Sequence, residues 1–148
     1  MLKIETKTFQ ELTTKELYEI LQLRSEVFVV EQDCVYQDLD GKDLKALHII
    51  GKKDNRIVAY TRVFKSGYYF KEASIGRVVV SKEERQYKYG YDIMEASIKA
   101  IEDYYNETTV KLSAQTYLKK FYNNLGFKEV GEEYMEDGIP HIEMIKQN

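Results

Sequence analysis

The chain has 148 residues, of which 43% are hydrophobic and 32% charged, and its 22 basic and 25 acidic side chains give a net charge of -3. A chain of this length is expected to form one domain, residues 1–148, that buries roughly 68–70% of its unfolded surface. The lack of positive net charge argues against a nucleic-acid partner, and a single cysteine, Cys34, excludes an internal disulfide and a cysteine-based zinc site.

Membrane insertion and export are not expected either. The sequence has no apolar run long enough to span a bilayer, and the residues after Met1 do not form the apolar core of a signal peptide. We therefore expect a cytoplasmic protein without a membrane partner.

The first half of the chain predicts a strand, a helix and three further strands. Residues 2–9 alternate as in a half-buried strand, and Thr13 and Glu16 form a capping-box pattern. Apolar residues then continue at helical spacing to Phe28. A long polar loop over residues 32–45 precedes strands expected at 48–51, 57–64 and 73–80, separated by turn signals at residues 54–56 and 66–67.

The second half predicts two helices and three strands. An amphipathic helix is expected from Tyr89 to Tyr104, and a shorter one over residues 116–125 is ended by Gly126. Strands are expected at 110–114, 127–134 and 141–145. This order predicts an α/β (α+β mixed) fold with a mixed, mostly antiparallel central sheet flanked by helices.

A charged turn joins the strand at 73–80 to the amphipathic helix. The first backbone N–H groups of a helix have no intrahelical partner, so Arg85, Lys88 and Gly90 at this point are typical of an anion site. A solvated basic turn is the alternative. The sequence contains neither a P-loop nor a three-glycine dinucleotide motif, which leaves a phosphate-bearing ligand of another kind.

Two stretches resemble the signatures of the GNAT N-acetyltransferases. "VSKEERQYKYG", which contains Arg85 and Gly90, is similar to the acyl-CoA-binding motif, with Lys88 where the family has its first glycine. "KKFYNNLGFKEV" is similar to the second signature, with Phe121 and Tyr122 followed by Leu-Gly-Phe. "LRSEVFVVEQDCVYQDLDGKD", "IGRVVVS" and "EDGIPHIEM" resemble the ElaA-like branch of bacterial proteins.

The resemblance implies a GNAT acyl-CoA N-acyltransferase fold and an N-acetyltransferase that uses acetyl-CoA as co-substrate. It implies that the pantetheine arm lies along the strand near Val78 and Val80, and that Tyr122 protonates the leaving thiolate. The implied cofactor-binding residues are Val78, Val79, Val80, Arg85, Gln86, Tyr87, Lys88, Tyr89, Gly90, Tyr91, Gln115 and Tyr122.

The general base is open, because relatives place a carboxylate where this chain has Ser74. His141 is our catalytic candidate beside Tyr122, with His48, Glu31 and a base acting through water as alternatives. A structural hydrogen-bonding role is the other interpretation of each histidine.

The acidic loop over residues 36–43 lacks the ligands of a calcium loop. It is interpreted either as a solvated loop or as the wall of an acceptor pocket for a cationic amine, and Cys34 beside it as a reactive thiol or a partly buried neutral cysteine.

Two functional alternatives are retained. One is a non-catalytic acyl-CoA-binding or sensing module, because of Ser74 and Lys88. The other is an N-acyltransferase for a longer acyl chain, because residues 24–28 resemble acyl-homoserine-lactone synthases. The expected partner is a small-molecule or peptide amine acceptor, and whether the chain forms a homodimer is left open.

Overall fold

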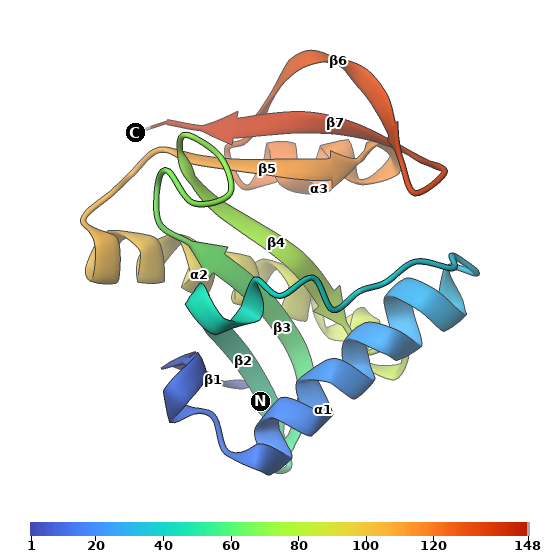
Figure 1. Ribbon diagram of the computed structural model, residues 1–148, viewed down its shortest axis with the longest axis vertical. Helices are drawn as coiled ribbons and strands as arrows, with labels where there is room; N and C mark the ends of the chain where they lie inside the picture. Colours follow the sequence, from blue (N-terminus) through green and yellow to red (C-terminus); the bar gives the residue numbers. More distant parts are fainter. Residues whose placement is uncertain (148) are drawn as a thin grey trace.

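The computed structural model describes residues 1–147 and is built on one seven-stranded sheet with the strand order β1-β2-β3-β4-β5-β7-β6 (Figure 1). Neighbouring strands are antiparallel except for β4 and β5, which are parallel. The expected mixed, mostly antiparallel sheet is therefore confirmed. The strands are β1 (Lys3–Thr8), β2 (Leu47–Lys53), β3 (Arg56–Phe64), β4 (Ala73–Val80), β5 (Val110–Gln115), β6 (Lys128–Glu136) and β7 (Ile139–Lys146).

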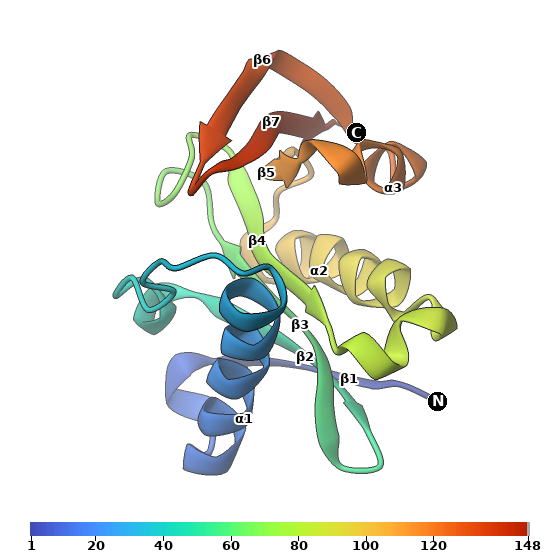
Figure 2. The same cartoon turned by 90° about the vertical axis from the view of Figure 1, so that its right-hand side faces the viewer.

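Helices cover both faces of the sheet. Because side chains alternate along a strand, the neighbours Ile49 and Ile50 of β2 belong to different hydrophobic clusters. Ile50 packs with Ile20 of helix α1, and Ile49 lies in the cluster that contains Ile93 of α2 and Tyr122 of α3. Figure 2 shows α1 and α2 on opposite sides of the strands. The helices are α1 (Thr14–Arg24), α2 (Tyr89–Tyr105) and α3 (Lys119–Asn124).

The predicted elements agree best with the structure at β4, which spans Ala73–Val80, and at α2. The prediction for α1 was wrong at its end. The α-helix stops at Arg24 and continues as a π-helical segment, η2 (Ser25–Glu31), in which the amide of Gln32 donates to Val27 O, five residues earlier. Val27, Val29 and Val30 in this segment are β-branched, which lowers its preference for a regular α-helix.

Three short 3-10 segments were not predicted, and a fourth, η5 (Thr116–Leu118), forms the first turn of the helix expected over residues 116–125. One of the three, η4 (Lys82–Tyr87), occupies the charged turn between β4 and α2. Within residues 1–147, no helix has the length and apolar character needed to cross a membrane. The other two unpredicted 3-10 segments are η1 (Phe9–Glu11) and η3 (Asp43–Lys45).

The sheet opens between its two parallel strands. β4 pairs with β5 at Ala73 and Ser74, and beyond these residues β4 follows β3 while β5 follows β7. Figure 1 shows the two strands diverging. Their separation leaves the edge of β4 after Ser74 without a partner strand among the described residues, so its backbone groups face the gap.

Candidate active site

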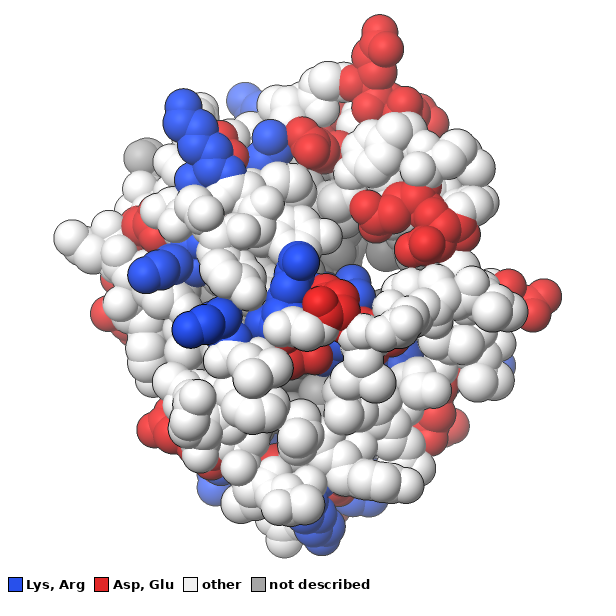
Figure 3. Space-filling view, viewed as in Figure 1, with Lys and Arg blue, Asp and Glu red and all other residues white. Residues whose placement is uncertain are grey.

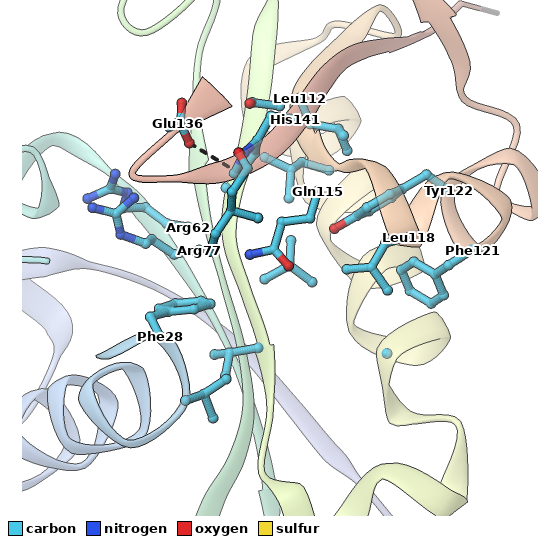
Figure 4. Close-up of a pocket in the computed structure, with 18 of the residues that line it drawn as sticks. Phe28, Arg62, Arg77, Leu112, Gln115, Leu118, Phe121, Tyr122, Glu136 and His141 are labelled. Atoms are coloured by element: carbon cyan, nitrogen blue, oxygen red, sulfur yellow. Dashed lines mark hydrogen bonds and ion pairs between the residues drawn. The ribbon is translucent and has the colours of Figure 1, made fainter. Parts of the chain in front are cut away.

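A cavity of about 620 Å³ fills the gap between β4 and β5. Its walls come from both strands, from the starts of α2 and α3, from the chain after α1 and from the β6–β7 hairpin. Figure 3 shows the hollow with acidic and basic side chains facing each other across it, and Figure 4 shows the residues that line it.

A β-bulge in β4 lies on the cavity wall. The β3–β4 register shifts between Tyr60 and Arg62, and Arg77 opposite the shift has φ +49°. A bulge re-aims the backbone groups beside it. The N–H and C=O groups of Val78 and Val80 therefore follow a kink at the open edge of the sheet, where an extended ligand can add as a strand.

Helix α2 begins at the cavity without a cap. Lys88 precedes it with φ +62°, in the left-handed region, and no side chain within residues 1–147 caps the helix start. Lys88 lines the cavity and takes part in no ion pair with the described part of the chain. The first N–H groups of α2 and the positive end of its dipole therefore remain available for an anion.

Arg85 lies at this turn, but its guanidinium is already occupied. Its Nε donates to the Val80 carbonyl oxygen at 3.1 Å, and its other two nitrogens donate to the Glu31 carboxylate at 2.5 and 2.8 Å. The Arg85 hydrogen bonds also hold the pKa of Glu31 below its usual value, so Glu31 is a poor base. The pair ties the chain after α1 to the end of β4.

Packing against Phe121 also explains why position 90 is a glycine, which the sequence did not reveal. A Cβ at this position would lie 3.2 Å from Cζ of Phe121, closer than most Cβ contacts. The absent side chain therefore lets the start of α2 approach α3, in addition to any role beside a ligand. The φ angle of Gly90 is not in the left-handed region.

Tyr122 extends from α3 into the cavity from a buried position. It is 5% exposed, and its ring packs edge-on against Phe121 and Phe127. Burial raises the pKa of Tyr122 well above its usual value, so the side chain remains a neutral phenol. A neutral phenol can donate a proton, which fits the role expected of Tyr122 as an acid.

The two histidines occupy different environments. His48 is fully buried, outside the cavity wall, and its ring nitrogens contact Tyr60 Oη at 2.6 Å and Asp43 O at 2.9 Å. Burial lowers the pKa of His48, so its role is structural. His141 lines the cavity, with Nδ1 2.7 Å from Ile139 O and Nε2 3.4 Å from the Glu136 carboxylate (Figure 4).

The carboxylates of the acidic loop are paired with arginines, and they do not form an acidic wall of the cavity. Arg24 Nε donates to Asp38 at 2.8 Å, and Arg77 Nε lies 2.7 Å from the same carboxylate. Burial disfavours ionisation of Asp43, but hydrogen bonds from arginines hold its pKa below the usual value. None of the three loop aspartates lines the cavity. The complete network contains Arg24, Arg62, Arg77, Asp38, Asp40 and Asp43.

Comparison with known proteins identifies the family. The model of the acetyltransferase (GNAT) domain matches residues 8–148. The chain belongs to the GNAT acetyltransferase family. It is 45% identical to the Escherichia coli protein ElaA over 139 residues, covering 93% of this chain and 91% of ElaA. This membership makes the chain an acyl-CoA-dependent acyltransferase by family, and its ElaA-like character is confirmed.

Solved structures agree with this assignment. The crystal structure of Escherichia coli ElaA has a TM-score of 0.92 at 42% identity, covering 99% of this chain and 100% of that chain. An acyl-CoA N-acyltransferase from Pseudomonas aeruginosa has a TM-score of 0.91, also at 42% identity, covering 97% and 99% of the two chains. The GNAT fold is therefore confirmed.

Most of the residues that the GNAT resemblance implied line this one cavity. Gln86, Tyr87 and Tyr89 do not: Tyr87 packs its ring against the Lys53 ammonium, 4.1 Å away, and Tyr89 is buried. The implied residues that line the cavity are Val78, Val79, Val80, Arg85, Lys88, Gly90, Tyr91, Gln115 and Tyr122, and His141, our candidate base, lines it as well.

Sequence reasoning missed the segment that covers the cavity. Gln32 contacts Gln115 of β5 at 3.4 Å, and the Cys34 thiol donates to Asp137 O of the β6–β7 hairpin at 3.3 Å. With the Glu31–Arg85 pair, these contacts join the chain after α1 to both sides of the gap. Residues so distant in sequence carry no local signal that would reveal these pairings.

Proposed function

We propose that the chain, acting as one GNAT domain over residues 1–148, transfers an acetyl group from acetyl-CoA directly to an amine. One observation carries the proposal. A single cavity contains the open edge of β4, the uncapped start of α2 and the buried phenol of Tyr122.

The donor would lie along β4. Its pantetheine arm would bond the backbone groups after the bulge, near Val78 and Val80, and its pyrophosphate would accept from the N–H groups at the start of α2. Lys88 would add a positive charge there. We assign Arg85 to holding the turn in place rather than to the phosphate, because each of its three guanidinium nitrogens already donates to Glu31 or to the Val80 carbonyl.

The reaction needs a proton donor and a proton acceptor. The amine nitrogen forms a bond to the acetyl carbon, the carbon–sulfur bond breaks, and the departing thiolate takes the Tyr122 proton. The N–H groups next to the β4 bulge would stabilise the negative charge on the thioester oxygen.

We propose His141 as the base. A carbonyl oxygen can only accept a hydrogen bond, so Nδ1 of His141 carries the hydrogen that Ile139 O accepts. The neutral ring then has its lone pair on Nε2, and Glu136 at 3.4 Å can stabilise the ring after it takes a proton. The unpaired Ser74, in the position of the family carboxylate, cannot take this role.

Release of CoA from acetyl-CoA in the presence of a panel of amines tests the function. The proposal expects release that depends on the amine and that slows as the acyl chain is lengthened from acetyl to butyryl to hexanoyl. Acyl-CoA binding without release would support the sensing module, and faster release from hexanoyl-CoA would support the longer-chain alternative.

A further inference from the structure

We infer that the amine acceptor also carries a carboxylate, which binds at a subsite formed by Arg62, Arg77 and Ser74. This inference rests on the proposed function, because it describes the second substrate of the same cavity. In Figure 4 Arg62 and Arg77 lie on the opposite side of His141 from Tyr122, beyond the place proposed for the thioester.

Strand register brings this subsite together. Arg62 of β3 lies opposite Gly76 of β4, and Phe64 lies opposite Ser74, so Arg62 and Ser74 are diagonal neighbours on one face. A Cβ at Gly76 would meet nothing within 4 Å. Gly76 is not in the left-handed region, so neither its backbone nor its packing demands a glycine. A side chain at Gly76 would project into open space on the face of β4 that lines the cavity together with Arg62.

Polar atoms at this space lack protein partners. Nε of Arg62 and Oγ of Ser74 are buried and form no hydrogen bond with any described residue. The Arg62 side chain is 2% exposed, and Ser74 is 3% exposed. A buried donor without a partner costs free energy, so a ligand group that accepts from both atoms would be stabilised there.

The arginines face the cavity and their aspartate partners do not. Arg62 and Arg77 line it, whereas Asp40 and Asp43, which pair with Arg62, lie outside its wall. A ligand therefore meets guanidinium groups on this side. A carboxylate matches the planar geometry of a guanidinium better than other anionic groups of its size.

The opposite wall suits an ammonium group. Glu136 and Asp137 of the β6–β7 hairpin line the cavity beside His141. Figure 3 shows acidic and basic side chains facing each other across this hollow. A ligand with an amine at one end and a carboxylate at the other, such as an amino acid, would match both walls.

Acceptor pairs that differ in the carboxylate test the inference. We would measure kcat/KM with acetyl-CoA for the standard amino acids, β-alanine and 4-aminobutyrate, each against its primary amide. Amidation keeps the size and removes the charge, and we expect the best acid to exceed its amide by about 10- to 100-fold. If every acid has the same kcat/KM as its amide, the inference is wrong and the N-acetyltransferase proposal survives. If no amine in the panel releases CoA, both are wrong.

Three variants locate the subsite. Ser74→Ala removes no protein hydrogen bond, so its thermal unfolding should match the wild type while KM for the acid rises several-fold. Gly76→Val should fold but exclude the acid, raising its KM by about 10-fold or more. Arg77→Gln should reduce the acid-to-amide ratio toward one. If all three variants fold and keep the wild-type acid-to-amide ratio of kcat/KM, the carboxylate binds elsewhere and the inference is overturned.

Discussion

Helices α1 and α2 begin in contrasting ways. At the start of α1, Thr13 accepts from the amide of Glu16 at 3.0 Å, and the Glu16 carboxylate accepts from the amide of Thr13 at 2.9 Å. At the start of α2, Lys88 adopts a left-handed conformation and offers no cap. The first helix satisfies its own backbone and stabilises the fold, whereas the second leaves N–H groups facing a cavity.

The capped start of α1 contributes to the stability of the fold, whereas the uncapped start of α2 is available for ligand binding. A cap is worth about 1 kcal/mol to a helix, so an uncapped start beside two basic residues is a cost that a bound anion would offset. Variants at the α1 cap should therefore change the free energy of unfolding and leave acetyl-CoA binding intact, whereas reversing the charge at the α2 start should weaken acetyl-CoA binding.

The largest expected effect lies beyond the α2 start, at Tyr122. Tyr122→Phe keeps the ring that packs against Phe121 and Phe127 but removes the proton donor. We expect kcat to fall by about 100-fold or more while acetyl-CoA affinity, measured by calorimetry, stays the same. Unchanged kcat would remove Tyr122 from the chemistry.

Charge at the α2 start should control cofactor affinity. Lys88→Glu places a negative charge where we propose the pyrophosphate, and acetyl-CoA binding should weaken by about 10-fold or more. Lys88→Gly is the matched control, since it removes the charge but suits φ +62° and should raise the free energy of unfolding by about 1 kcal/mol. If Lys88→Glu binds acetyl-CoA as tightly as the wild type, the phosphate site is misplaced.

The ionised Glu16 carboxylate stabilises the start of α1, and this stabilisation should be lost in acid. Burial would raise its pKa, but Lys7, the Thr13 amide and Lys52 bond the carboxylate and lower the pKa from 4.5 to about 2. Its contribution is complete above pH 4.5 and is lost as the pH falls toward 2. Glu16→Gln should lower the free energy of unfolding at pH 7 by about 2 kcal/mol, with the difference narrowing in acid. A difference that does not change with pH would contradict this assignment.

Thr13→Ala tests the other half of the same capping box. It should lower the free energy of unfolding by about 1 kcal/mol in a urea titration. Acetyl-CoA affinity should not change, and a loss of affinity comparable to that of Lys88→Glu would show that the two helix starts are not independent.

The smallest expected effect is a change in acetyl-CoA affinity in Glu31→Gln. It distinguishes two roles for Arg85, because the two roles predict changes in opposite directions. If Arg85 holds the turn through Glu31, then Glu31→Gln loosens the turn and acetyl-CoA binding weakens by about threefold. If Arg85 is instead a phosphate ligand restrained by Glu31, the same variant frees it and binding tightens. Calorimetry separates these outcomes, and tighter binding would contradict our assignment.

Local pattern predicted the elements well where apolar periodicity was clear. The bounds of β4 and the start of α2 follow directly from the β-branched run and from the apolar face that begins at Tyr89. The two GNAT signatures also placed Tyr122 and the α2 start at one cavity, as the structure has them.

The remaining features depend on contacts between distant residues. The Arg85–Glu31 pair joins positions 54 apart, and the reason for Gly90 is a ring on another helix. The acidic loop looked solvated because its arginine partners come from α1, β3 and β4. The bulge at Arg77 was also missed, since a positive φ at an arginine has no sequence signal.

A crystal structure of the protein with acetyl-CoA would show directly whether the cofactor binds in the gap between β4 and β5. We expect the pyrophosphate on the backbone amides at the start of α2, the arm beside Val78 and Val80, and the sulfur within hydrogen-bond reach of the Tyr122 hydroxyl. A nucleotide bound elsewhere, or a sulfur remote from Tyr122, would contradict it.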